Sequence, residues 1–255
     1  MSRPPAGVGD NDSDKATPAG QQQVAAQRAR PGPFEEGLRP AMRYWGFRAG
    51  AWVASHLPPA LGRAAAGAGG RIAYRAAKGK RTVVERNIGR VVGAAPEQVP
   101  ARDRVVRAAF RSYARYWFDV LRLGSLGPAE LDAVETVNIE ALDAALARGR
   151  GVVVVTPHFG SYDVAVAWLG HRGYRFHTAA EVLRPRALYE WFAAQREAYG
   201  MTVVPSEPGA VARRRLTRAL QRGEGVALPA ERDLARRGVW VEFFGERTTF
   251  PAGPA

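Results

Sequence analysis

The sequence contains no cysteine, so disulfide bonds and cysteine-ligated metal sites are excluded. It has no apolar run approaching the roughly 18 residues of a membrane-spanning helix, and its first residues lack the apolar core of a secretory signal. Acidic residues are scarce as well, because residues 39–90 contain eleven basic side chains and Glu85 alone with a negative charge. The net charge of +13 predicts an anionic partner: nucleic acid, anionic lipid or a phosphate-bearing substrate.

The length of 255 residues suits one domain with its own core. Residues 1–33 are rich in Pro, Gly, Asp, Gln and Ala and contain almost no large apolar side chain, which is typical of disorder. Ordered structure is expected to begin near Phe34. We therefore divide the chain into a disordered tail, residues 1–37, and a folded domain, residues 38–255.

The most informative stretch begins at Gly151 and continues with four valines, Thr156 and then Pro-His158-Phe-Gly-Ser-Tyr-Asp163. A short run of β-branched residues predicts a strand that is covered on both faces of a sheet. Ser161 has the side chain of a helix N-cap, and the apolar residues after it predict a helix. His158 is thus expected at the carboxyl end of a strand, where ligands bind in open α/β sheets.

His158 and Asp163 have the side chains of a general base and its orienting carboxylate. An imidazole titrates near neutral pH and can take a proton from an attacking hydroxyl, and a carboxylate on its other nitrogen stabilises the imidazolium. On a regular helix a spacing of five residues places side chains about 140° apart, so the pairing requires His158 to precede the helix and fold back onto its first turn. The alternative is a turn histidine without a chemical role, followed by a first-turn acid that the helix dipole favours.

The chain before this stretch is expected to be almost entirely helical. Helices are predicted over residues 38–57, 60–77, 81–92, 102–123 and 139–148, with a short helical turn opening at Pro128. The first of these mixes aromatic residues with Arg39, Arg43 and Arg48. That mixture is typical of a helix lying in a membrane interface, and it equally fits an amphipathic helix packed on its own domain with solvated arginines.

Strands and helices alternate in the second half of the chain. Further strands are predicted over residues 174–180, 201–205, 225–230 and 239–244, with helices over residues 185–199 and 207–222. This order predicts an α/β fold in which helices flank a mostly parallel central sheet, next to a helical N-terminal region.

Acidic residues follow several predicted strands. Glu181 follows residues 174–180, and Glu231 and Asp233 follow residues 225–230. Because the carboxyl ends of parallel strands share one edge, these carboxylates are expected to face one crevice with His158, within reach of Arg196. Such a crevice suits activation of a hydroxyl and binding of a phosphate-bearing donor. The other histidines lack metal-ligand spacing, and the sequence contains no Gly-x-Ser-x-Gly elbow and no Walker loop.

Two blocks resemble the lipid A biosynthesis (lauroyl/myristoyl) and glycerolipid acyltransferase superfamily. The first is His158-Phe-Gly-Ser-Tyr-Asp163, which looks like the family's His-x4-Asp/Glu block. The second, about 70 residues later, is Glu231-Arg-Asp-Leu-Ala-Arg-Arg-Gly-Val-Trp-Val-Glu-Phe-Phe-Gly245 followed by Pro251-Ala-Gly-Pro-Ala255. Arg86-Asn87 is similar to an upstream element of the family. The resemblance covers about residues 38–255 and is strongest to the actinobacterial phosphatidylinositol mannoside acyltransferases.

The resemblance implies an acyl-CoA-dependent O-acyltransferase that uses acyl-CoA as co-substrate and no cofactor. It would move a fatty acyl chain to a mannose hydroxyl of a phosphatidylinositol mannoside, with His158 as general base, Asp163 as its partner and Glu231 as a further catalytic residue. The remaining implied residues line the acceptor and donor pocket and are Glu181, Arg196, Arg232, Asp233 and Glu242. Under a small shift in alignment, Asp233 or Glu242 takes the role of Glu231.

The implied partners are acyl-CoA, a phosphoinositide glycolipid acceptor and an anionic membrane surface, with no nucleic acid. The implied location is peripheral, at the cytoplasmic face of the plasma membrane, where each Lys or Arg near the surface contributes about 1 kcal/mol. Family members continue for several tens of residues past the second block, so residues 38–255 are expected to form a domain that is truncated at its C-terminus.

Two alternatives remain open at the level of sequence. One keeps the fold and changes the acceptor to a lysophospholipid or another glycolipid. The other is a basic nucleic-acid-binding protein, which the net charge and Arg213-Arg-Arg215 favour, although no nucleic-acid-reading module is recognisable.

Overall fold

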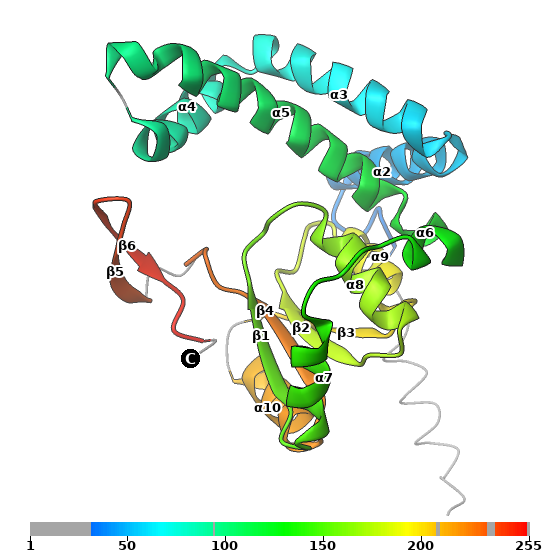
Figure 1. Cartoon of the computed structure of the whole chain (residues 1–255). Helices are drawn as coiled ribbons and strands as arrows, with labels where there is room; N and C mark the ends of the chain where they lie inside the picture. Colours follow the sequence, from blue (N-terminus) through cyan, green and yellow to red (C-terminus); the bar gives the residue numbers. More distant parts are fainter. Residues whose placement is uncertain (1–31, 94, 208–209, 234–237, 254–255) are drawn as a thin grey trace, which may run out of the picture.

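The computed structural model describes residues 32–93, 95–207, 210–233 and 238–253 (Figure 1). Most of the expected tail, residues 1–31, lies outside the described residues. Its last part forms a turn, in which the Gly37 amide donates a hydrogen bond to the Phe34 carbonyl at 3.0 Å. The first described helix begins directly afterwards, at Leu38, as predicted.

A layer of long helices lies above the carboxyl edge of the sheet in Figure 1. It consists of α2 (Leu38–His56), α3 (Pro59–Ala76), α4 (Lys78–Val92), the 3-10 turn η1 (Pro96–Gln98) and α5 (Val99–Leu121). α4 and α5 begin earlier than predicted. Pro100 falls between the helices predicted over residues 81–92 and 102–123, but it lies in the first turn of α5, where a proline has no helical hydrogen bond to lose.

Glycines on α3 allow it to pack closely on α5. A methyl group on Gly70 would lie 2.7 Å from the backbone of α5 at Arg111, and one on Gly62 would meet the buried ring of Phe118. Gly69, between them, has open space around it. Gly62 and Gly70 are therefore part of a helix–helix contact, and Gly69 is not.

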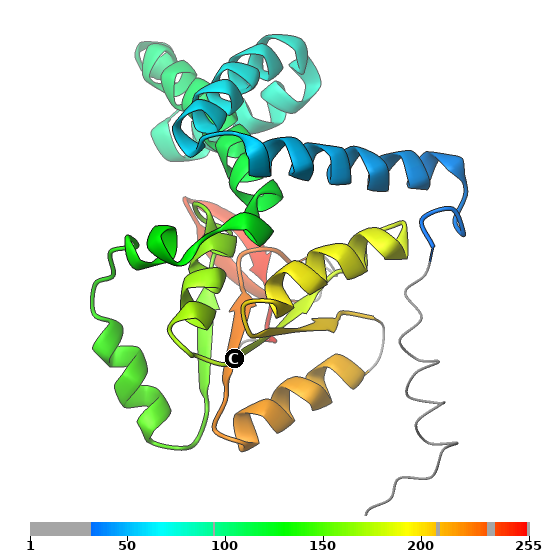
Figure 2. The ribbon, with the colours of Figure 1, turned by 90° about the vertical axis from the view of Figure 1, so that its right-hand side faces the viewer.

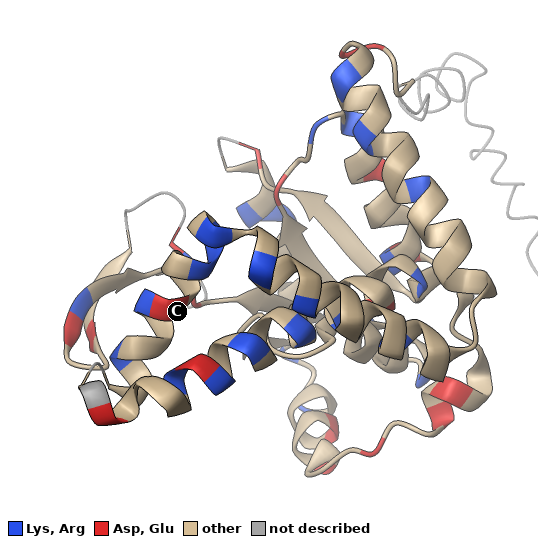
Figure 3. Cartoon of the chain, turned by 90° about the horizontal axis from the view of Figure 1, so that it is seen from above, with Lys and Arg blue, Asp and Glu red and all other residues tan. Residues whose placement is uncertain are grey.

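Basic residues are spread along this helical layer, as Figure 3 shows from above. Exposed examples on α3 and α4 are Arg71, Arg75, Lys78, Lys80, Arg86 and Arg90. The charge asymmetry of the sequence is therefore an asymmetry of the molecule, since the helical layer carries much of the positive charge.

The helical layer leads into an α/β unit through η2 (Leu123–Ser125), α6 (Pro128–Asp132) and α7 (Ile139–Ala147). The unit then alternates β1 (Val152–Thr156), α8 (Tyr162–His171), β2 (Phe176–Ala180), α9 (Arg186–Glu197), β3 (Met201–Pro205), α10 (Val211–Gln221) and β4 (Gly225–Pro229). All four strands are parallel, in the order β1-β4-β2-β3. This confirms the predicted α/β class.

The strand order places helices on both faces of the sheet. The chain moves in one direction from β1 to β2 to β3 and then returns to β4, so right-handed crossovers put α8 and α9 on one face and α10 on the other (Figure 2). The return inserts β4 directly beside β1. Reversals of this kind create the crevices in which α/β proteins bind ligands.

The two halves of the sheet are joined over a short distance. β1 pairs with β4 along five residue pairs, and β2 pairs with β3 along five, but β2 and β4 pair only at Phe176↔Gly225 and His177↔Val226. These two pairs lie at the amino end of the strands. Toward the carboxyl end the ladder between β2 and β4 stops.

The valine strand is less covered than predicted. Val152 and Val154 pack against the main core cluster, but Val153 is 38% exposed and Val155 is 57% exposed. β1 lies at the edge of the sheet, and α10 contacts β2, β3 and β4 on the side that these two valines face. The prediction that both faces are covered is wrong for this strand.

The last predicted strand lies outside the main sheet. β5 (Val239–Phe243) forms an antiparallel hairpin with β6 (Glu246–Phe250), which was not predicted. The turn between them has positive φ at Phe244 and Gly245, a conformation that favours a tight reversal. Figure 1 shows the hairpin to one side of the sheet and below α4, and Arg90 of α4 forms an ion pair with Glu246 at 2.7 Å.

Candidate active site

His158 lies in the loop between β1 and α8, at the carboxyl edge of the sheet, as predicted. Its side chain is 37% exposed, and the adjacent Phe159 is 82% exposed. Gly160 has φ 59°, which lets the loop turn sharply before the helix begins. The imidazole is therefore held at the surface by a short reversal of the chain, where a substrate can reach it.

The partner of His158 is Glu231. His158 Nδ1 and Glu231 Oε1 form a hydrogen bond between residues 73 positions apart. The register explains the contact, because Thr156 of β1 pairs with Pro229 of β4 and the Ala230 amide donates to the Thr156 carbonyl at 3.1 Å. Two residues beyond this last pair on each strand, the imidazole and the carboxylate meet.

This hydrogen bond sets the protonation pattern of the pair. Burial raises the pKa of Glu231, but its hydrogen bonds with the His158 side chain and with backbone groups outweigh burial, so the pKa is lower than usual. Glu231 is then ionised at neutral pH and can only accept a hydrogen bond. The proton of neutral His158 accordingly lies on Nδ1, which leaves the lone pair of Nε2 available for a proton from a substrate.

Asp163 does not contact the imidazole, contrary to the expected pairing. Its side chain is fully buried in the first turn of α8, and Oδ1 accepts a hydrogen bond from Arg196 Nε of α9 at 2.7 Å. Its Oδ2 lies 3.4 Å from the Tyr116 hydroxyl of α5. A spacing of five residues carries Asp163 into the interior while His158 stays in the loop, so the carboxylate ties α8 to two other helices.

The polar groups around Asp163 are one cation, the Arg196 guanidinium, and the neutral hydroxyls of two tyrosines, Tyr116 and Tyr162. Burial lowers the pKa of Arg196, but attraction to Asp163 and their hydrogen bond outweigh it and keep the pKa above its usual value. Burial also raises the pKa of both Tyr116 and Tyr162, so their hydroxyls stay protonated. The Tyr116 hydroxyl donates to that of Tyr162 at 2.9 Å, and the Tyr162 ring stands edge-on to the His158 ring with centroids 5.1 Å apart.

The other predicted site residues do not all lie at the carboxyl edge of the sheet. Glu181 is exposed directly after β2, and Arg232 is exposed beside Glu231, so both lie at the carboxyl edge of the sheet. Asp233 Oδ2 accepts a hydrogen bond from the Gly238 amide at 2.7 Å, across residues that lie outside the described part of the chain. Glu242 is exposed on the hairpin, where it pairs in register with Arg247.

Arg196 of α9 is bound within the fold to Asp163. It was expected to face the same crevice as the carboxylates, but its side chain is only 16% exposed and is bound to Asp163. This arginine therefore supports α8 from within the fold instead of presenting its charge to a ligand.

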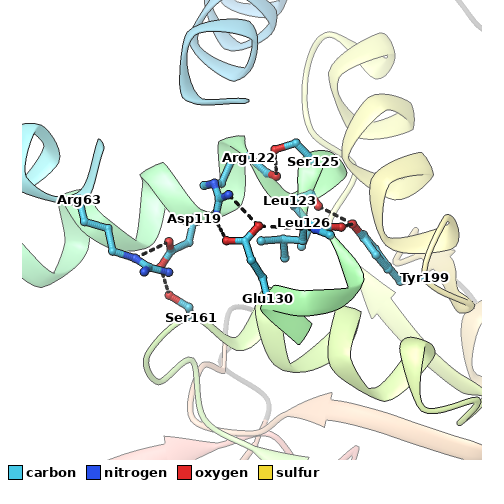
Figure 4. Close-up of polar contacts among 10 residues, drawn as sticks. Arg63, Asp119, Arg122, Leu123, Ser125, Leu126, Glu130, Ser161 and Tyr199 are labelled. Carbon is cyan, nitrogen blue, oxygen red and sulfur yellow. Dashed lines mark hydrogen bonds and ion pairs between the residues drawn. The ribbon is translucent and has the colours of Figure 1, made fainter. Parts of the chain in front are cut away.

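A second polar cluster next to the His158 loop was not predicted as part of the site (Figure 4). Asp119 of α5 accepts hydrogen bonds from the Ser161 hydroxyl at 2.6 Å and from Arg63 Nε of α3 at 3.3 Å. Nearby, Arg122 donates two hydrogen bonds to Glu130, at 2.8 and 3.0 Å. The available signal in the sequence was a single acid, Asp119, between the core residues Phe118 and Val120.

Comparison with known proteins gives the family. The bacterial lipid A biosynthesis acyltransferase family matches residues 34–255. The chain belongs to this family. Two proteins called phosphatidylinositol mannoside acyltransferase are 40% identical to it over 216 residues, one from Mycolicibacterium smegmatis and one from Mycobacterium tuberculosis. The alignments cover 82% and 83% of this chain and 68% and 67% of those relatives.

Membership of this acyltransferase family agrees with the expected reaction class. The described residues contain no group of three or more His, Asp or Glu side chains arranged to hold a metal ion. Within the same residues, none of the helices combines the length and apolar character that crossing a bilayer requires. The candidate site of this acyltransferase is thus a histidine–carboxylate pair at the edge of a parallel sheet.

Proposed function

We propose that the chain transfers a fatty acyl group from acyl-CoA to a mannose hydroxyl of a phosphatidylinositol mannoside. The observation that carries this proposal is the hydrogen bond between Glu231 and His158 Nδ1, which leaves Nε2 of an accessible imidazole free to act as a base. The acceptor comes from the names of the two mycobacterial relatives. The donor, acyl-CoA, is the one that the family resemblance implies.

The proposed reaction uses His158 as a proton shuttle. Nε2 takes the proton from the acceptor hydroxyl as the hydroxyl oxygen attacks the thioester carbonyl and forms a C–O bond. The tetrahedral intermediate then collapses, the C–S bond breaks, and the CoA thiolate receives the proton from the imidazolium. Glu231 stabilises the positive charge that the imidazolium carries between these steps.

The remaining site residues divide between substrate contact and support. Glu181 and Arg232 are exposed at the same edge as the pair, and we assign them to the acceptor hydroxyls and the donor phosphates, respectively. Asp163 and Arg196 support the first turn of α8, and Asp233 is bound to the Gly238 amide just before β5. Glu242 lies on β5 of the hairpin, so it can contact a substrate only if that substrate extends from His158 to the hairpin.

Peripheral binding to an anionic membrane at the cytoplasmic face fits the surface of α2. Leu38, Met42, Trp45 and Trp52 follow one another at steps of four, three and seven residues, which places them on one side of a helix, and each is more than half exposed. Tyr44 and Phe47, by contrast, pack against the core cluster around Val120. One face of α2 therefore packs on its own domain, and the opposite face is the one that we propose for the membrane, because exposed Trp and Arg on one helix are typical of membrane interfaces.

Membrane binding is tested with vesicles that contain phosphatidylinositol. Replacing both Trp45 and Trp52 by Ser is expected to weaken partitioning at least about fivefold, because interfacial tryptophans contribute buried apolar area. Trp240→Ser is the matched control, since Trp240 is 63% exposed but lies on the hairpin. An equal loss of vesicle partitioning in the α2 variant and in the Trp240→Ser control would show that α2 is not the element that docks on the membrane.

The reaction is tested by release of CoA thiol from palmitoyl-CoA with and without phosphatidylinositol mannoside. Release that depends on the acceptor and is lost in His158→Ala supports the donor, the acceptor and the base together. Release that is lost in the variant but is unaffected by this acceptor rejects the acceptor, and lysophospholipids and other glycolipids are then assayed. A folded protein without thiol release contradicts the proposed reaction.

The basic charge supports a second candidate, binding to nucleic acid. Arg213, Arg214 and Arg215 are all exposed on α10, on the face of the sheet opposite α8 and α9. Binding to duplex DNA at 150 mM salt that exceeds binding to anionic vesicles would favour this function. The His158–Glu231 pair has no place in it, which is why we prefer acyl transfer.

A further inference from the structure

The loop that carries His158 has few hydrogen bonds of its own. Thr156 Oγ1 donates to the Pro157 carbonyl at 3.0 Å, and the Phe159 amide donates to the same carbonyl at 2.9 Å. Both bonds are local and connect the loop to no other element. Its position is therefore determined by its two ends and by the His158–Glu231 bond.

The downstream end of the loop is held by an unexpected use of Ser161. This residue is the N-cap of α8, and its carbonyl accepts from the Val164 amide at 2.9 Å, but its side chain makes no capping hydrogen bond. The hydroxyl instead donates to Asp119 Oδ2 at 2.6 Å, across 42 positions in the chain. A serine that is suited to cap its own helix is used to fix the loop to α5.

Asp119 is built into the helical layer. Its side chain is almost fully buried between Phe118 and Val120, and Arg63 Nε of α3 lies 3.3 Å from Oδ1. A buried carboxylate is costly unless it is paired and hydrogen-bonded, and Arg63 and Ser161 supply these interactions. Figure 4 shows the three side chains converging from α3, α5 and the start of α8.

We propose that Asp119 is a positioning residue for acyl transfer, which acts through Ser161 to hold the His158 loop at the distance that Glu231 requires. The inference rests on the proposed role of His158 as base. Asp119 is not itself a catalytic residue, because its carboxylate is buried and faces Ser161 and Arg63. Asp163 and Arg196 hold the next turn of α8, so loss of the Asp119–Ser161 bond loosens the loop without detaching it.

Kinetics of four variants test this inference: Ser161→Ala, Asp119→Ala, the double variant and Ser161→Thr. Each alanine variant is expected to lower kcat between about 10- and 100-fold with KM changed less than about threefold, because small misplacements of a reacting group reduce turnover strongly. The double variant should be no slower than the slower single variant, since both break one hydrogen bond. Ser161→Thr keeps the hydroxyl and should keep most of the activity.

A spectroscopic readout separates this inference from the proposed function. A proton on His158 Nδ1 that is bound to Glu231 gives a downfield proton resonance, which His158→Ala identifies by its loss. The inference predicts that this resonance broadens or shifts upfield in Ser161→Ala, whether or not the wild-type protein transfers acyl groups. An unchanged resonance together with unchanged kcat overturns it.

Glu130→Gln is the matched control. Glu130 is a second carboxylate paired with an arginine in the same cluster, but its partners are Arg122 and the Gly127 amide, away from the His158 loop. This variant is expected to lower thermal stability and leave both kcat and the His158 resonance unchanged. If Glu130→Gln lowers kcat as much as Ser161→Ala does, Asp119 has only a structural role.

Discussion

Asp163 accepts a hydrogen bond from Arg196 at 2.7 Å in a fully buried setting, five residues after the histidine to which it was expected to bind. A buried ion pair of this kind holds two helices in a fixed relation, because an uncompensated charge in the interior is costly. The acid of the His-x4-Asp block therefore stabilises the frame of the site. The acid that contacts the imidazole comes from another strand.

Glu231→Gln is expected to lower turnover about 100-fold or more with little change in the melting temperature. The amide preserves the shape of the side chain, but it removes the negative charge that stabilises the imidazolium and fixes its tautomer. Steady-state kinetics of acyl transfer, with folding checked by circular dichroism, measure the effect. Turnover within twofold of wild type would show that Glu231 does not serve His158.

Asp163→Asn is expected to act first on stability. It leaves Arg196 without its anionic partner inside the protein, and breaking a buried pair in this way costs about 3 kcal/mol or more. Chemical denaturation measures the loss, and adding Arg196→Met should recover part of it because the unpaired charge is removed. At a temperature at which Asp163→Asn and Glu231→Gln are both folded, Asp163→Asn should lower kcat less than Glu231→Gln does. The reverse order would indicate that Asp163 is the carboxylate that serves His158.

The Arg122–Glu130 pair predicts a pH dependence of stability. The hydrogen bonds from Arg122 hold the pKa of Glu130 below its usual value, although burial opposes this. A carboxylate with a depressed pKa stabilises the folded state above its unfolded pKa and loses this contribution as the pH falls through its folded pKa. The difference in melting temperature between wild type and Glu130→Gln should thus be constant near neutral pH and shrink below about pH 4. A difference that persists at pH 2 would contradict an ionic origin.

Two neighbouring glycines on α3 should respond in opposite ways to alanine. Gly70→Ala places a methyl group 2.7 Å from the α5 backbone, which cannot give way as a side chain could, so destabilisation of about 1–3 kcal/mol is expected. Gly69→Ala meets open space and should be neutral or stabilise by up to about 1 kcal/mol through helix propensity. Thermal melts of the two single variants, side by side, measure the contrast. Similar shifts in both would show that α3 and α5 do not pack through Gly70.

The sequence predicted the elements well because their signals are local. The helical N-terminal half, the strand before His158 and the strand over residues 201–205 all follow from periodicity and β-branched runs within a few residues. The exact bounds of β3 were predicted. The position of His158 at a strand end followed from the same local reasoning.

Strand order is not a local property, and the pairing of Glu231 with His158 depends on it. That β4 returns to lie beside β1 depends on which sheet arrangement buries more surface, and only this arrangement brings Glu231 to His158. The antiparallel hairpin was missed because β6 begins with Glu246-Arg247 and reads as a polar end. The roles of Ser161 and Asp119 needed the packing of α5 against the loop, which no short window contains.

The pairing of β1 with β4 also determines the stage of folding at which His158 and Glu231 can form their hydrogen bond. His158 follows the first strand of the sheet to be synthesised, and Glu231 follows the last of the four parallel strands, 73 positions later. In the sheet β1 pairs with β4 and with neither β2 nor β3, so a chain that has folded only through β3 has neither the histidine loop anchored at the sheet edge nor the carboxylate beside its imidazole. The proposed His158–Glu231 pair therefore forms only with the final strand of the parallel sheet, and recovery of activity during refolding is expected to follow the docking of β4.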